Sequence, residues 1–321
     1  MPAKKTGTKK TKNKARASRK SPRKLPKQNY RSFRLHKRIR HDDKPLPKAR
    51  HLFSAAIRHI WRHKKLFLGI LLVQLIFTLI FVTGFGLFSS DLGETKSIVQ
   101  DLLGPDSTLY TGATLLGILV TSGSGQTSEV GNLYGMILLL INSLAIIWAL
   151  RKTHAKTAPR LKEAYYQGMY PLIPFILVTV VILLQLLPLV IGNALYSIVI
   201  SNGIAVTGLE QAVWLLLFIG LALLSIYMIT SSLFALYIVT LPDVRPLQAL
   251  RSARQLVLHR RMMVARKLVF LPVVLLVLLA VMLLPIVIYV TPIAEVAFFV
   301  LGNAGLLIGH AYSYELYREL L

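Results

Sequence analysis

The sequence predicts an all-α membrane protein: a polytopic bundle of about six transmembrane helices, with cytoplasmic interfacial amphipathic helices and a disordered basic tail at its N-terminus. Three observations support this class. Hydrophobic residues make up 54% of the 321 residues and charged residues only 16%, where soluble domains have about a quarter. Long stretches carry no charge at all. The net charge of +25 is concentrated near the N-terminus instead of being spread along the chain.

These contrasts divide the chain into three parts. Residues 1–46 are rich in Lys and Arg and poor in apolar side chains, which predicts a disordered cytoplasmic tail. Residues 47–65 alternate apolar and basic positions at helical spacing, which predicts an interfacial amphipathic helix. Residues 66–321 form the membrane domain.

The membrane spans follow from the length of the uncharged runs. A helix rises about 1.5 Å per residue, so about 20 apolar residues cross a hydrocarbon core roughly 30 Å thick. The last apolar stretch is too long for one crossing, and Thr291-Pro292 divides it into a tight hairpin because proline removes a backbone donor. The predicted spans are residues 66–88, 131–150, 171–199, 212–239, 268–289 and 293–312.

The orientation follows from which connections are basic. The tail, residues 151–162 and residues 245–267 are rich in Lys and Arg. Residues 89–130 are acidic with Lys96 as their only basic side chain, and residues 201–211 have no Lys or Arg. Because basic loops stay in the cytoplasm, this alternation predicts a multi-pass protein of the cell membrane (the plasma membrane) with both termini cytoplasmic.

Several features near the membrane surfaces complete the topology. Tyr110 to Val120 is apolar but too short to span, which predicts a re-entrant or interfacial piece. Glu295 is expected at the outer edge of the last hairpin, in contact with water. Gly305 and Gly309 have the GxxxG spacing that permits close helix–helix contact and oligomerisation. Tyr312, Tyr314 and Tyr317, at the inner end of the last span, are expected at headgroup level.

Two segments beside the spans have the pattern of helices that lie in the headgroup layer. In Pro47–Lys65, apolar residues such as Leu52 and Ala56 recur at helical spacing between arginines. In Pro246–Lys267 the apolar stripe consists of Leu247, Leu250, Ala253 and Val257. The basic side chains that we expect to contact anionic lipid headgroups are Arg58, Arg62, Lys64, Lys65, Arg251, Arg254, Arg260 and Arg261.

The second segment also carries a resemblance to a known family. Leu241-Pro242-Asp243, Pro246-Leu247, Ala249-Leu250-Arg251-Ser252 and Leu256-Val257 resemble the inner-loop motif of six-span bacterial proteins of the glycerophosphoryl diester phosphodiesterase membrane-domain type. The similarity covers about the last third of the chain, and the chain departs from the motif at His259-Arg260-Arg261. It implies a membrane bundle and carries over no catalytic residue, because the family name describes a separate catalytic domain.

Motifs for catalysis are missing from the sequence. It has no cysteine and no HExxH, GxSxG or P-loop pattern, so we expect neither an enzyme nor a cofactor, and no small-molecule substrate is identifiable. His59 and His63 could share a metal ion, but beside Arg58 and Arg62 they are better explained as part of a cationic face, and no metal site is predicted. Polar residues inside the spans either line a substrate path or form interhelical hydrogen bonds: Gln74, Asn142, Gln185, Asn303 and His310.

Three functional hypotheses remain. The first is a non-enzymatic scaffold or membrane-homeostasis protein whose basic tail binds anionic lipid. The second is a permease or transporter component, which predicts a polar cavity lined by Gln74, Asn142 and Gln185. The third is a membrane tether that binds RNA or the ribosome through the tail, because clustered Lys and Arg also bind nucleic acid without sequence preference.

Overall fold

The computed structural model describes residues 46–83, 96–98, 111–117, 129–157 and 159–321. All regular structure in these ranges is helical. The predicted disordered tail, and with it the RNA or ribosome contact, lies outside the described residues apart from residue 46. The class predicted from composition, an all-helical chain with helices long and apolar enough to span a membrane, is confirmed for the described part.

Within the described residues, six helices are long and apolar enough to cross a membrane, as predicted. They are α2 with its π-helical continuation, α5, α7, α8, α10 and α11. Among the described residues, the shorter helices α1, α6 and α9 precede or connect them. The bounds are α1 Ala49–Arg62, α2 Lys64–Thr78 continued by Leu79–Thr83, α5 Glu129–His154, α6 Leu161–Gly168, α7 Leu172–Ser201, α8 Gly208–Val239, α9 Pro246–Val257, α10 Arg261–Tyr289 and α11 Thr291–Leu320.

Several helices continue beyond the predicted apolar runs. α10 begins at Arg261 instead of residue 268, and α11 continues to Leu320 instead of ending at 312. A helix satisfies its own backbone groups, so it can extend past the apolar run wherever packing supports it. Hydropathy marks the apolar part of a helix and not its ends.

The expected break between the last two spans is confirmed. Val290 alone separates α10 from α11, with φ −135° and ψ 59°. The following proline stands in the first turn of α11, where its missing N–H costs nothing. Pro188 lies inside α7 instead, and there the backbone N–H of Leu189 donates to Ser225 Oγ on α8 at 3.0 Å.

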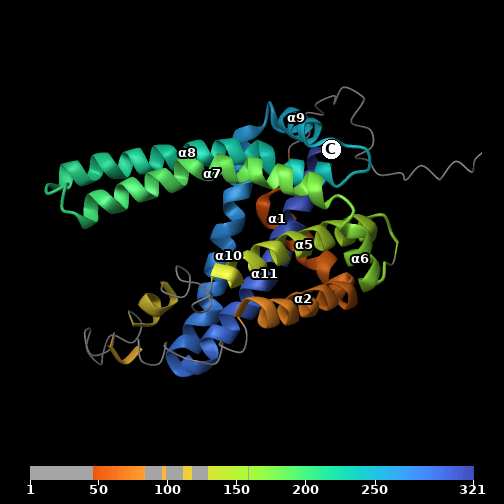
Figure 1. Ribbon diagram of the computed structural model, residues 1–321, viewed down its shortest axis with the longest axis horizontal. Helices are drawn as coiled ribbons and strands as arrows, with labels where there is room; N and C mark the ends of the chain where they lie inside the picture. Colours follow the sequence, from red (N-terminus) through yellow and green to blue (C-terminus); the bar gives the residue numbers. More distant parts are fainter. Residues whose placement is uncertain (1–45, 84–95, 99–110, 118–128, 158) are drawn as a thin grey trace, which may run out of the picture.

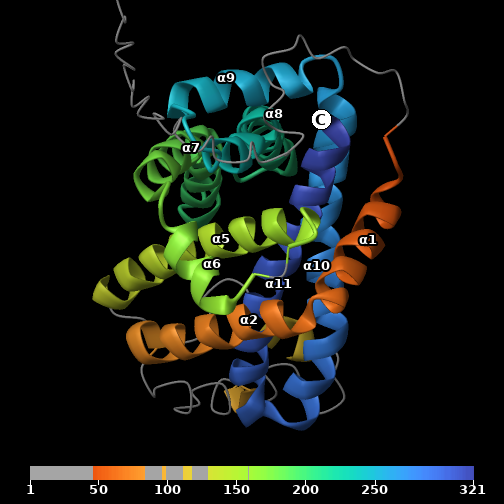
Figure 2. The same cartoon turned by 90° about the vertical axis from the view of Figure 1, so that its right-hand side faces the viewer.

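The helices form diverging hairpins rather than a bundle of parallel helices. α7 and α8 run side by side and project sideways in Figure 1, whereas α10 and α11 run across that direction in both views (Figure 2). The hairpins meet in one region, which we name the basic end. It contains the start of α2, the end of α5, the start of α10 and the end of α11, with α1 and α9 beside them.

The main hydrophobic core lies at this basic end. It joins Phe67 of α2, Ile147 of α5, Phe234 of α8 and Tyr312 of α11, all at most 2% exposed. The helices differ in how much of them other parts of the chain cover. In α5, 50% of the most apolar stretch is buried, whereas in α8 only 6% is. The projecting helices therefore present apolar side chains outward, as lipid-facing helices do.

The two amphipathic helices bury part of their apolar faces against protein. α1 packs on α11 and buries Leu52 and Ala56 while Trp61 stays 73% exposed. α9 packs on α8 with Ala253 and Val257 buried, as the predicted stripe requires. Leu247 of that stripe is 69% exposed instead, because the buried face of α9 is rotated toward Ala249 and Leu256.

At the opposite end of α10 and α11, a short helix covers the hairpin turn. Residues 111–117, the described part of the Tyr110–Val120 segment, are helical, and Leu115 packs on Leu283 and Val287. Lys96 Nζ donates to the Ile288 carbonyl at 2.7 Å and to Thr291 Oγ1 at 2.9 Å. Glu295, one turn after the start of α11, is only 7% exposed, so the expectation of a water-exposed side chain was wrong.

Two further expectations about α11 differ from the structure. Tyr312, Tyr314 and Tyr317 do not face the surface; they are at most 7% exposed, and Tyr317 stacks on Phe234 and on Tyr237 of α8. A Cβ atom at Gly305 would meet nothing within 4 Å, so the GxxxG pair does not mediate close packing within this chain. Periodicity cannot distinguish a face that meets lipid from one that meets another helix.

Candidate functional site: a cationic cleft at the basic end

Three segments far apart in the sequence enclose a cleft at the basic end. They are α1 with His63, the end of α5 with the residues that follow it, and the last turns of α11. The cleft has a volume of about 640 Å³, within the range of small-molecule sites. It is lined by His51, Ala55, Arg58, His59, Arg62, His63, Thr153, His154, Lys156, Thr157, Glu315 and Arg318.

Helical spacing places the charged groups on this side. Arg58 and Arg62 are four residues apart on α1, as are His59 and His63, so each pair shares a face of the helix. Glu315 and Arg318 are three apart on α11 and form an ion pair of 3.4 Å. The burial of Leu52 and Ala56 against α11 sets the rotation of α1 that turns these residues toward the cleft.

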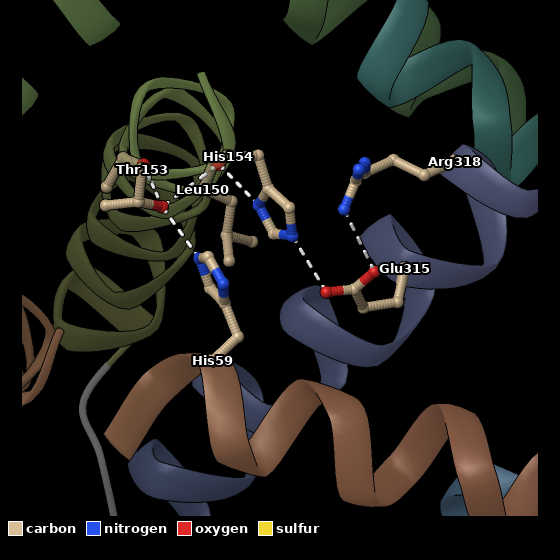
Figure 3. A network of polar contacts seen from close by, with 7 residues as sticks. His59, Leu150, Thr153, His154, Glu315 and Arg318 are labelled. Atoms are coloured by element: carbon tan, nitrogen blue, oxygen red, sulfur yellow. Dashed lines mark hydrogen bonds and ion pairs between the residues drawn. The ribbon is translucent and has the colours of Figure 1, made fainter. Parts of the chain in front are cut away.

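His154 is held at both ring nitrogens (Figure 3). Its Nδ1 lies 2.8 Å from the Leu150 carbonyl and its Nε2 lies 2.8 Å from Glu315 Oε1. The ring thus links the last turn of α5 to Glu315 of α11.

His59 lies against His154 as a neutral ring. The ring centroids are 3.8 Å apart and the planes differ by 16°. Thr153 Oγ1 donates to the Ala149 carbonyl at 2.9 Å, so it accepts the hydrogen bond from His59 Nε2 at 2.8 Å. Burial, the charge of His154 and the nearby His63 lower the pKa of His59 to about 4, although Glu315 acts in the opposite direction.

We considered whether the cluster of His59, His154 and Glu315 could bind a metal ion. His59, His154 and Glu315 offer ligand atoms within 4.8 Å of one another. The two rings are stacked nearly parallel, however, so their lone pairs do not converge on one point. Glu315 is already engaged by His154 and Arg318. The observed arrangement is that of a hydrogen-bonded network rather than a metal site.

The charge of the cleft is strongly positive. Arg58, Arg62, Lys156 and Arg318 are fixed cations, and Glu315 is the only acid among its lining residues. The last carbonyls of α5 are occupied within the chain; the Lys152 carbonyl, for example, accepts from Thr157 Oγ1 at 2.7 Å. The free hydrogen-bonding capacity of the cleft is therefore mostly that of donors, as an anion requires.

A second cavity of about 780 Å³ lies between α5, α6, α7 and the turn from α8 to α9. Its most deeply placed cation is Arg151, which is 8% exposed and donates to the Tyr237 carbonyl at 3.2 Å and to the Thr240 carbonyl at 2.7 Å. Arg151 thus caps the end of α8. Lys152 lies over the Trp148 ring at 5.4 Å.

Of the polar residues predicted within the spans, Gln74 and Asn303 meet each other, whereas Asn142 and His310 bond to other partners. Gln74 Nε2 donates to Asn303 Oδ1 at 2.6 Å, and Asn142 Oδ1 accepts from Tyr165 Oη at 2.9 Å. His310 Nε2 lies 3.0 Å from Ser143 Oγ. Gln185 lies on α7, half-buried, and none of its described contacts joins it to the others. These pairings match interhelical hydrogen bonding and give no support to the permease hypothesis.

The predicted headgroup contacts are spread over the basic end. Arg58 and Arg62 line the cleft, whereas Arg251 and Arg254 are exposed on α9. Arg260 and Arg261, where α9 passes into α10, are half-buried, and Arg261 lies 4.9 Å from the Tyr227 ring. Lys64 and Lys65 are exposed at the start of α2.

Sequence reasoning missed His154, Lys156, Glu315 and Arg318 as members of a site. His154 and Lys156 come from a segment about 95 residues after His59, and Glu315 and Arg318 from one about 160 residues further along the chain. Only the folded arrangement brings these residues next to Arg58 and His59. No local sequence pattern predicts that they meet. Glu315 is one of two acids in the last turns of α11 and stands three residues before Arg318, so in the sequence the two look like an ordinary surface ion pair.

Comparison with known proteins gives no relative for this arrangement. No protein-family model, no curated protein and no solved structure matches the chain.

Proposed function

We propose that the chain is a multi-pass membrane protein that holds anionic phospholipid headgroups at its basic end, in a non-enzymatic scaffold or membrane-homeostasis role. Both termini and the basic end lie on the cytoplasmic side. α1 and α9 lie at headgroup level, each with one apolar edge toward lipid. The observation that carries this proposal is the set of exposed basic side chains beside the apolar helices, among them Lys64, Lys65, Arg251 and Arg254.

The exposed side chains of the basic end support this placement. Trp61 is 73% exposed at the end of α1, with Lys64 Nζ 5.8 Å from its ring. Tyr170 is 90% exposed between α6 and α7. Exposed aromatic rings beside basic side chains, next to apolar helices, are the composition of a membrane interface. Each nearby Lys or Arg adds about 1 kcal/mol of attraction to an anionic leaflet.

Lipid retention tests this proposal directly. The full chain is purified in mild detergent from membranes that contain phosphatidylglycerol and phosphatidylethanolamine, and native mass spectrometry counts the bound lipids. We expect enrichment of the anionic lipid, reduced in a variant with Lys64→Gln, Lys65→Gln, Arg251→Gln and Arg254→Gln and weakened by salt. Equal retention of the two lipids by the wild-type chain would contradict the proposal.

A further inference from the structure

The cleft carries more positive charge than its own acid can balance. Arg58 and Arg62 are like charges four residues apart on one helix, an arrangement that costs stability when no anion lies between them. Lys156 adds a third cation from the segment after α5 and Arg318 a fourth from α11. Glu315 is shared between His154 and Arg318, so it does not neutralise the two arginines of α1.

The donors come from three sides of one small space. Arg58 and Arg62 reach it from α1, Lys156 from the end of α5, and Arg318 from α11. Guanidinium groups bind phosphate oxygens through paired N–H bonds, and a lysine adds a mobile point charge. A volume of about 640 Å³ accommodates a phosphorylated headgroup but not a folded domain.

We propose that this cleft binds a phosphomonoester group, held by Arg58, Arg62, Lys156 and Arg318. A phosphodiester such as phosphatidylglycerol carries one negative charge, whereas a monoester carries about 1.5 to 2 at neutral pH and has three terminal oxygens that accept hydrogen bonds. A cleft with four cations and one acid matches the larger negative charge of a phosphomonoester better than the single charge of a phosphodiester. The inference rests on the proposed function only in placing the cleft at headgroup depth.

The same chemistry occurs in a lipid such as phosphatidate and in soluble phosphomonoesters. In both cases the ligand stabilises the folded chain in proportion to its affinity, so a thermal shift reports binding. The purified full chain is titrated with dioctanoyl phosphatidate, dioctanoyl phosphatidylglycerol, glycerol 3-phosphate and inorganic phosphate. The two lipids share their acyl chains and differ only in the phosphate group.

We expect phosphatidate to bind about tenfold more tightly than phosphatidylglycerol, the equivalent of one additional charge-assisted hydrogen bond. If glycerol 3-phosphate binds as tightly as phosphatidate, the site is a phosphomonoester site with a soluble ligand. If only phosphatidate binds, the ligand is a lipid. Equal binding of the two lipids overturns the proposal and leaves general attraction to anionic lipid, the proposed function, intact.

Matched variants locate the site. Arg58→Gln with Arg62→Gln removes two charges inside the cleft, and Arg251→Gln with Arg254→Gln removes two exposed charges on α9. We expect the first pair to weaken phosphatidate binding about tenfold or more and the second to leave it unchanged. If the first pair does not fold, Lys156→Gln, which changes an exposed side chain outside the helices, serves instead. Equal losses in the cleft and α9 variants would overturn the assignment.

Discussion

At the scale of single residues, the stacked His59 and His154 rings make the basic end sensitive to acid. The unfolded chain protonates His59 near its ordinary pKa of 6.5, whereas the folded chain holds the pKa of this ring at about 4. Between these values the unfolded state binds a proton that the folded state does not. The contribution of His59 to the free energy of unfolding is therefore fully present above about pH 6.5. It decreases as the pH drops toward 4 and changes no further below that pH.

Replacing the ring tests this origin of acid sensitivity. His59→Gln keeps a donor that can reach Thr153, and it should flatten the fall in thermal midpoint between pH 6.5 and 4.5. The expected contribution is of the order of 1 kcal/mol once solvent screening is allowed for. His51→Gln, an exposed position of the same cleft, serves as the control and should keep the wild-type slope. An identical slope in both variants would assign the effect elsewhere.

Arg151 should be a structural residue although it belongs to a basic connection. Arg151→Gln removes donors from the Tyr237 and Thr240 carbonyls and should lower the free energy of unfolding by about 1–3 kcal/mol. Lys152→Gln removes the same charge from the neighbouring residue, which lies over the Trp148 ring and makes a weaker contact. Thermal unfolding in detergent compares the two. A smaller loss for Arg151→Gln than for Lys152→Gln would contradict the capping role.

At the scale of elements, the packing of α6 on α5 depends on close approach. A Cβ atom added at Gly168, the last residue of α6, would lie 3.3 Å from Ala145 Cα and from the Leu144 carbonyl oxygen. These are backbone atoms, which cannot move aside to accommodate a new side chain as the end of a flexible side chain can. This contact helps set the path of the chain from the cleft side of α5 to the start of α7.

A pair of leucine substitutions measures that contact. Gly168→Leu should destabilise the fold by about 1–3 kcal/mol through overpacking. Gly220→Leu, on α8, meets nothing within 4 Å and should be neutral or stabilising by up to about 1 kcal/mol, because it removes a helix glycine. The midpoints of thermal unfolding compare the two variants. Similar midpoints would show that α6 does not pack closely on α5.

At the scale of the whole molecule, the orientation in the bilayer is open to a direct test. The chain has no cysteine, so single cysteines report accessibility without background. Val206→Cys lies between α7 and α8, 82% exposed, whereas Lys162→Cys and Arg254→Cys are exposed at the basic end. A membrane-impermeant maleimide added to intact cells should label the first and spare the other two. Labelling of Lys162→Cys from outside would contradict the proposed orientation.

The diverging hairpins also follow from how little protein contact the projecting helices make. α7 and α8 pack on each other and α10 on α11, but only 6% of the most apolar stretch of α8 is buried inside the chain. Lipid tails are as apolar as leucine, so such helices gain little by choosing protein over lipid. Tight packing is confined to the basic end, where polar and aromatic side chains give specific contacts such as those of Tyr237 and Arg151.

Length, hydropathy and proline chemistry are local properties, so the sequence alone predicts the helical class, the six apolar helices and a break between the last two of them. Packing between distant helices brings His154 and Glu315 together with His59, places Arg151 at the end of α8, and buries Tyr312 and Glu295. These outcomes depend on which faces of distant helices pack together. A periodic pattern shows that a helix has an apolar face but does not name the surface that covers it.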